Sequence, residues 1–232
     1  MTEKTEHIAT SSNDLNKLRA AVLGANDGIV STAGIVLGVA GAAASKETIL
    51  IAGFAGLVAG AISMAAGEYV SVSSQRDSEK AFLTQRRTHI SKNPDSITKE
   101  LVEIYQAKGL SKKTAQLVAS ELKEKGFLNR ELEKESGIDP DDISNPWSAT
   151  IASALSFTAG AIIPLAAIAF APDAWRVPVT AFAVLLSLIL AGTLSARAGQ
   201  ASKLRAALRI VVWGIGAMVI TYAIGHLIGV SL

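Results

Sequence analysis

The chain has 232 residues, of which half are hydrophobic and 18% are charged, and its formal net charge is +2. This charge is too small to indicate a nucleic-acid-binding protein. The absence of cysteine excludes disulfides, iron–sulfur clusters and thiolate zinc sites. The charged residues are also segregated from long apolar segments, and a soluble protein would need far more polar chain around such segments. The composition therefore favours a membrane protein.

Five segments with almost no charged residues are each long enough to cross a hydrocarbon core of roughly 30 Å as an α-helix. They are 20–44, 48–72, 147–171, 177–196 and 210–232. We therefore predict an all-α, polytopic membrane protein with five transmembrane helices. Its expected parts are an N-terminal cytoplasmic segment, two membrane helices, an inserted cytoplasmic helical domain and three further membrane helices: residues 1–19, 20–72, 73–146 and 147–232.

Lys and Arg residues are concentrated in alternate connections between these segments. Residues 1–19 hold three and residues 197–209 hold four, whereas 45–47 and 172–176 hold one each. Residues 73–146 add thirteen to the first group. Because cytoplasmic loops carry the excess of positive charge, we expect the N-terminus and 73–146 in the cytoplasm and the C-terminus outside. The location that we expect is the cell membrane.

The inserted segment 73–146 carries thirteen acidic and thirteen basic residues and has a helical pattern. The second membrane helix is predicted to continue through Ser91, because nothing before Asn93-Pro94 interrupts it. Shorter helices follow, and they are delimited by stop glycines and one N-cap serine: Gly109, Ser111, Gly126 and Gly137.

Asp27 and Glu68 are the only acidic residues inside the predicted crossings. An ionised Asp at the centre of a membrane helix costs about 2.5–3.5 kcal/mol even on the lenient insertion scale, so such residues are usually functional. Helix geometry places Asp27 roughly 9 Å and Glu68 about 6 Å from the same surface, so we expect them at similar depth. Met64 lies on the same face one turn from Glu68. Two carboxylates and a thioether predict a site for a transition metal, since Mg²⁺ and Ca²⁺ prefer oxygen alone.

The alternatives for these residues are structural. Glu68 could be a snorkelling carboxylate near the membrane surface, and Met64 alone would be typical of a core methionine that fills a gap. The glycine pairs Gly34/Gly38 and Gly56/Gly60, each four residues apart, predict close helix packing. One copy offers few ligands for a dehydrated divalent ion and a twofold pair offers twice as many, so we predict a homodimer whose first helices face each other at Gly34 and Gly38.

Several stretches of the sequence resemble the vacuolar iron transporter family. They are NDGIVST at 26–32, AGLVAG at 55–60, SMAAGEYVSV at 63–72, NPW at 145–147 and ASALSF at 152–157. The resemblance spans nearly all of 20–230 and implies a five-helix homodimer that exports Fe²⁺, and often Mn²⁺, from the cytosol in exchange for protons. It also implies that Asp27, Met64 and Glu68 lie along the metal pathway.

In the cytoplasmic domain the resemblance implies metal ligands at Glu100, Glu103 and Glu135. Other positions depart from the family pattern, because cationic or neutral side chains stand where glutamates or a methionine are common: Arg86, His89, Ile97 and Lys123. Cations beside a ligand set oppose metal capture. Two interpretations stay open, a weakened metal store and a structural helical domain.

We therefore predict a secondary transporter, not an enzyme, that exports Fe²⁺ and/or Mn²⁺ from the cytosol by proton antiport and carries no prosthetic group. Asp27 and Glu68 can bind either protons or metal, which is the competition that an antiporter needs. The expected partners are the lipid membrane, divalent metal ions, protons and a second copy, with no nucleic acid. The alternative is a membrane-anchored metal-binding sensor or scaffold without transport, which would concentrate its ligands in the soluble domain.

Overall fold

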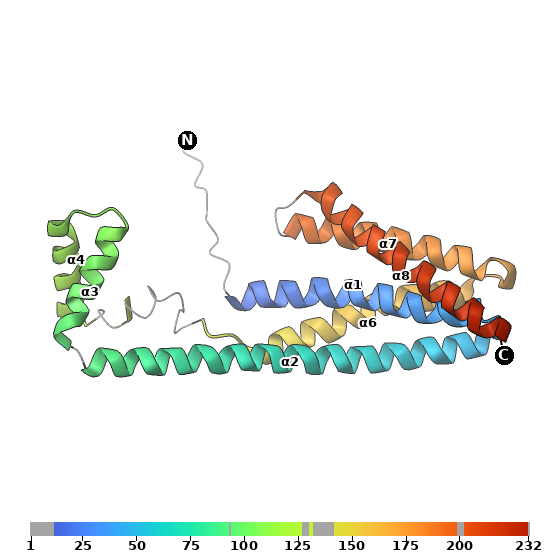
Figure 1. The fold of residues 1–232 in the computed structure, drawn as a ribbon, viewed down its shortest axis with the longest axis horizontal. Coiled ribbons are helices and arrows are strands. Elements are labelled where there is room, and N and C mark those ends of the chain that lie inside the picture. The colour runs from blue at the N-terminus through green and yellow to red at the C-terminus, as the bar shows by residue number, and fades with distance from the viewer. Residues whose placement is uncertain (1–11, 93, 127–129, 132–141, 199–201, 232) are drawn as a thin grey trace. The chain divides into compact units, whose positions relative to one another are not determined.

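The computed structural model describes residues 12–92, 94–126, 130–131, 142–198 and 202–231 (Figure 1). Within these ranges every regular element is a helix: α1 (Ser12–Gly41), α2 (Lys46–Lys92), α3 (Pro94–Ala107), α4 (Lys112–Glu124), α6 (Pro146–Phe170), the 3₁₀ turn η1 (Asp173–Trp175), α7 (Arg176–Ala198) and α8 (Lys203–Ser231). Five of them are long and apolar enough to cross a membrane, namely α1, α2, α6, α7 and α8. The all-α class with five spans is confirmed.

Two helices begin earlier than the hydropathy pattern predicts. The first begins at Ser12 rather than near residue 20, and the last begins at Lys203 rather than at residue 210. Hydropathy marks the part of a helix that lies in hydrocarbon, whereas intrahelical hydrogen bonds continue through charged residues at either end. The continuation of the second span as one helix to Lys92 agrees with the prediction.

The chain divides into two compact units, which are described separately. The membrane unit comprises Asp14–Ser71 and Pro146–Leu232. The inserted unit comprises the described residues of Val72–Asn145. The helix α2 contributes its first half to the membrane unit and its second half to the inserted unit.

The core of the membrane unit is built around α1. Ile29, Ala33, Val36 and Leu37 of this helix are buried against side chains of α2, α6, α7 and α8, among them Ile49, Ile168, Leu188 and Met218. Of the five spans, α1 has the largest buried share. Residues on α1 are therefore positioned by several neighbouring helices at once.

Glycines let the helices of the membrane unit approach closely. A Cβ added to Gly28 would clash with the backbone of Phe157 on α6, and one added to Gly225 would clash with the backbone of Gly38. A Cβ on Gly38 itself would lie 3.2 Å from the Thr221 carbonyl oxygen of α8. Close packing at glycines is confirmed, and Gly34 and Gly38 lie against Thr221 of α8 in their own chain. The predicted contact of these two glycines with a partner copy stays a prediction.

The inserted unit has its own small core. Ile90 from α2 packs with Ile97 and Leu101 from α3 and with Ala115 and Ala119 from α4. The predicted boundaries of α3 and α4 are confirmed: Gly109 and Gly126 have φ of +97° and +73°, and the Ser111 side chain accepts a hydrogen bond from the Thr114 N–H. The predicted helix end at Gly137 lies outside the described residues.

In the inserted unit, a network of hydrogen bonds joins Ser144 to Gln75 and Glu79 of α2. Both carboxylate oxygens of Glu79 accept hydrogen bonds from Ser144, at 3.0 Å each, and Gln75 donates to Glu79 and to Ser144 at 2.9 Å. Ser144 is buried, so its backbone N–H and hydroxyl both find partners away from water.

Candidate functional site

Asp27 and Met64 lie at the same level of the membrane unit. The register between antiparallel helices α1 and α2 is given by Gly56, which contacts Ile35. Asp27 is eight residues before Ile35 and Met64 is eight residues after Gly56, so the two lie level with each other. Asp27 is partly buried. The backbone carbonyl oxygen of Asp27 accepts a 2.6 Å hydrogen bond from the Ser31 hydroxyl, so this bond does not involve the Asp27 carboxylate.

Glu68 lies one helical turn beyond Met64, about 6 Å nearer the end of the bundle that holds the start of α1. Its depth therefore differs from that of Asp27 by more than the sequence predicts. Glu68 is buried, and its Oε1 accepts a hydrogen bond from Nη2 of Arg19 at 3.1 Å. The carboxylate of Glu68, one of the predicted metal ligands, is thus already paired with Arg19 of the same chain.

Phe157 of α6 packs between α1 and α2 directly beside these residues. Its backbone lies against Gly28 and its ring lies against Gly60, and only 1% of the residue is exposed. Met64 is partly buried against the cluster that Phe157 forms with Leu57 and Ala161. Met64 therefore also serves the core, so the structural interpretation of this residue and the ligand interpretation are compatible.

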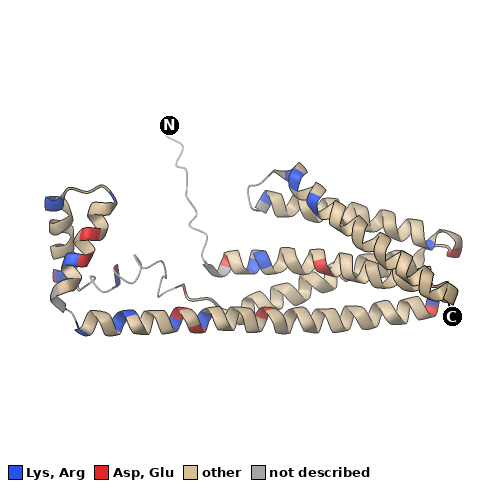
Figure 2. Cartoon of the chain, in the orientation of Figure 1, with Lys and Arg blue, Asp and Glu red and all other residues tan. Residues whose placement is uncertain are grey.

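The charges of the membrane unit are concentrated toward helix ends, and long stretches of its helices carry none (Figure 2). Within the described residues, no group of three or more His, Cys, Asp or Glu side chains gathers to hold a metal ion. Asp27 therefore lies on α1, and Met64 and Glu68 lie on the neighbouring helix α2, and in the described part of the chain no shell of three carboxylates or histidines surrounds them.

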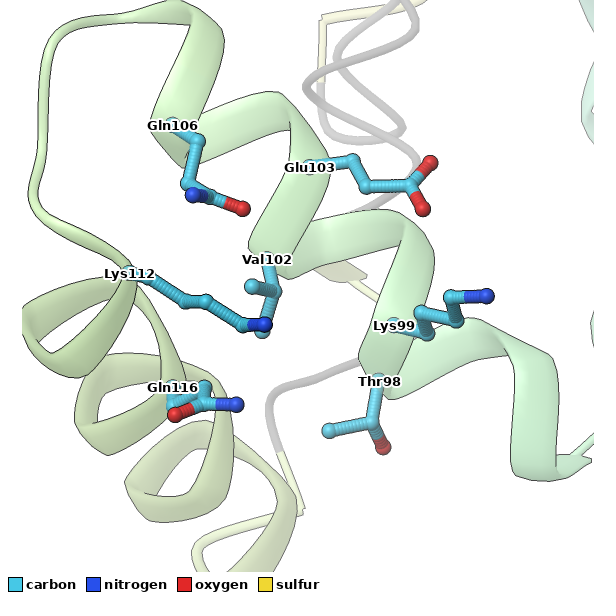
Figure 3. Close-up of a pocket in the computed structure, with 7 residues that line it drawn as sticks. All are labelled: Thr98, Lys99, Val102, Glu103, Gln106, Lys112 and Gln116. Atoms are coloured by element: carbon cyan, nitrogen blue, oxygen red, sulfur yellow. The ribbon is translucent and has the colours of Figure 1, made fainter.

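The two predicted ligands of the inserted unit that the structure describes each lie beside cations. Glu100 forms an ion pair with Arg86 of α2. Glu103 lines an open cleft of about 610 Å³ between α3 and α4, where Lys99 and Lys112 also line the wall. Figure 3 shows Lys112 extending from α4 across this cleft toward α3. Glu135 lies outside the described residues.

Two residues of the site were missed by the sequence analysis. Arg19 lies outside the apolar segment that hydropathy marks as the first span, so a contact with Glu68 had no local signal. Phe157 resembles any apolar residue of its span. The signal for Phe157 was the pair of glycines Gly28 and Gly60, which make room for it from two different helices.

Comparison with known proteins identifies the family. A sequence model of the VIT family matches residues 18–226. The chain is 39% identical to a vacuolar iron transporter of Acanthamoeba castellanii, over 90% of this chain and 78% of that protein. It is 38% identical to vacuolar iron transporter homolog 3 of Arabidopsis thaliana, over 91% of this chain and 83% of the relative. It is 36% identical to VIT-like transporter 1b of Glycine max, over 92% and 77% respectively. The chain therefore belongs to the VIT family.

Proposed function

We propose that the protein is a secondary transporter that moves a divalent transition metal, Fe²⁺ and/or Mn²⁺, out of the cytosol in exchange for protons. The observation that supports the proposal is that Asp27, Met64 and Glu68 lie on two contacting helices, α1 and α2, with Asp27 level with Met64. The names of the relatives, which are iron transporters, support the choice of iron.

The chemistry of these side chains suits exchange of metal and protons. A carboxylate binds either a proton or a cation, so occupancy by one excludes the other. The Met64 thioether adds a soft ligand that favours transition metals over Mg²⁺ and Ca²⁺. Because ionised groups in a membrane are costly, Asp27 and Glu68 are expected to be retained for this purpose.

Arg19 gives Glu68 a cation in the absence of metal. Its guanidinium is attached to α1 and reaches the buried carboxylate from the more exposed side. An arriving metal ion, or a proton, competes with this tethered cation for the same oxygen. We propose that Glu68 is the first carboxylate that the metal meets from the cytosol and that Asp27 is the second.

A homodimer would complete the ligand set. The face of α2 beside Met64 and Glu68 carries small exposed residues at intervals of four, namely Ala55, Ala59, Ser63 and Gly67. Spacing of this kind lets two membrane helices approach closely. We propose that α2 of a second copy packs on this surface, which would bring a second Met64 and Glu68 to the path.

The proposed orientation follows the charge bias of the connections, with the N-terminus and residues 73–146 in the cytosol. We propose the cell membrane as the location. The names of several relatives refer to the vacuole, and the same orientation there would deliver metal to the vacuolar lumen.

The test is metal flux in proteoliposomes that contain the purified protein, with and without a pH gradient. The variant Asp27→Asn keeps the size of the side chain and removes its charge, so flux should fall to background while the protein still inserts. The matched control is Asp77→Asn, which makes the same change at an exposed position of α2 in the inserted unit. Control flux should equal that of the unmodified protein.

Two results would contradict the proposal. If Asp27→Asn carries metal at the unmodified rate, Asp27 does not lie on the path. If the unmodified protein binds metal but never moves it, under any gradient, the anchored sensor or scaffold is the better description.

A further inference from the structure

A cleft of about 350 Å³ opens on the flank of α1, between this helix, the end of α7 and the start of α8. Four polar side chains line it: Arg19, Asn26, Ser195 and Arg209. The remaining lining is aliphatic and comes from α1 and α8. The cleft therefore combines two guanidinium groups with apolar walls.

An apolar groove continues from this cleft. The groove has a volume of about 420 Å³, lies between α1, α6 and α7, and shares Leu18, Val22 and Ser195 with the cleft. Along α1 it extends from Leu18 to Ile29, roughly 16 Å. This length is close to the ~15 Å that the hydrocarbon of one bilayer leaflet occupies. Its only lining side chains with polar atoms are two serines.

The polar groups of the cleft have unused hydrogen-bonding capacity. The Arg19 guanidinium gives one nitrogen to Glu68 and has further N–H donors. Arg209 makes no ion pair with any residue that the structure describes. Within the same described part of the chain, the buried Asn26 Oδ1 has no hydrogen-bond partner. Guanidinium groups suit a phosphate, and an amide oxygen suits a hydroxyl donor.

We propose that the cleft and groove together bind one anionic phospholipid, with its phosphate between Arg19 and Arg209 and one acyl chain along α1. A headgroup with hydroxyl donors, as in phosphatidylglycerol, would also satisfy Asn26. The charges around the cleft favour this occupant, because Arg197 and Lys203 add positive charge near the same end of α7 and α8. A second copy docked symmetrically would instead bring like charges together.

The binding experiment uses the purified full-length protein in a neutral detergent. Phosphatidylglycerol and phosphatidylcholine with the same acyl chains are titrated, and bound lipid is counted by native mass spectrometry. We expect one phosphatidylglycerol per chain to be retained at concentrations where phosphatidylcholine is lost. Because no metal or flux is involved, the result does not depend on the proposed transport.

The contribution of the headgroup site is tested by substituting two arginines of α8. Arg209→Gln should weaken phosphatidylglycerol binding about fivefold, the factor expected for one basic side chain near an anionic headgroup. Arg205→Gln removes the same charge one turn away, at an exposed residue that does not line the cleft, and should change binding less than twofold.

Substitutions in the groove test whether it binds an acyl chain. Ala159 is exposed and lines the groove, so Ala159→Leu should narrow it without disturbing the core and weaken phosphatidylglycerol binding. The control Ala223→Leu makes the same change at an exposed position of α8 outside the groove, and binding should hold.

Several outcomes would overturn the proposal. Equal affinity for the two lipids would show that Arg19 and Arg209 do not select an anionic headgroup. Equal effects of Arg209→Gln and Arg205→Gln would reduce the preference to general surface charge. Full competition by glycerol phosphate at equal concentration would assign the cleft to a soluble anion, and lipid retained only by a dimer would assign it to an interface between copies.

Discussion

Glu68 Oε1 and Arg19 Nη2 lie 3.1 Å apart, yet the two side chains differ sharply in exposure, 9% for Glu68 and 56% for Arg19. The buried Glu68 carboxylate needs Arg19 to stabilise its charge, whereas water can solvate the exposed Arg19 guanidinium without Glu68. Removal of either partner is therefore expected to have unequal consequences.

The first prediction follows from this asymmetry. Glu68→Gln leaves an arginine that water can reach, so the free energy of unfolding should fall by less than about 1 kcal/mol. Arg19→Gln leaves a buried carboxylate without its cation and should cost about 1–3 kcal/mol, below the range for fully buried pairs because Arg19 is half exposed. Thermal unfolding in detergent measures both. The double variant should be more stable than Arg19→Gln alone, and the opposite order would contradict the dependence.

The second prediction concerns the thioether. Met64→Leu nearly preserves volume, so stability should change by less than about 1.5 kcal/mol. Loss of the soft ligand should raise KM for Fe²⁺ or Mn²⁺ several-fold with a smaller change in maximal rate. The matched control is Met218→Leu on α8, a core methionine that belongs to a different apolar cluster from that of Met64. Equal KM changes in the two variants would show that packing, and not ligation, explains the effect.

The third prediction tests the homodimer. The chain has no cysteine, so a single Ser63→Cys substitution on the small-residue face of α2 provides one reactive site. Oxidation in membranes should give a covalent dimer. Ala223→Cys on α8 should give little dimer, because its neighbours are expected to be lipid. Dimer from Ala223→Cys alone would place the interface on α8 instead.

The fourth prediction concerns the inserted unit. Glu100 is neutralised by Arg86, and Glu103 shares its cleft with two lysines, so the double variant Glu100→Ala with Glu103→Ala should reduce metal flux less than twofold. The double variant Glu121→Ala with Glu124→Ala on α4 controls for the loss of two charges. Complete loss of flux in the first pair, with a normal control, would show that this unit handles metal in an essential way.

The fifth prediction concerns orientation. Ser120→Cys in α4 and Ser231→Cys at the end of α8 change exposed positions on opposite sides of the proposed bilayer arrangement. A membrane-impermeant maleimide added to intact cells should label only the second. Labelling of Ser120→Cys alone would show the reversed topology, and labelling of both would place the two positions on the same side and contradict the proposed arrangement.

Local patterns in the sequence were sufficient to predict the all-α class, the five spans and the limits of α3 and α4. These features depend on local properties: apolar length, charge bias, and caps such as Ser111 and Gly109, each of which acts within a few residues. The sequence also singled out Asp27 and Glu68, because an ionisable group in an apolar segment is conspicuous without any knowledge of its neighbours. Met64 followed from its position one helical turn from Glu68.

The tertiary structure was needed to show which helix faces meet. It paired Glu68 with Arg19, directed Gly34 and Gly38 toward α8 of the same chain, and inserted Phe157 between Gly28 and Gly60. Each of these contacts joins segments far apart in the sequence. Their partners depend on the register and crossing of whole helices, and a stripe of small or apolar residues is equally suited to several neighbours, so only the packed bundle selects one.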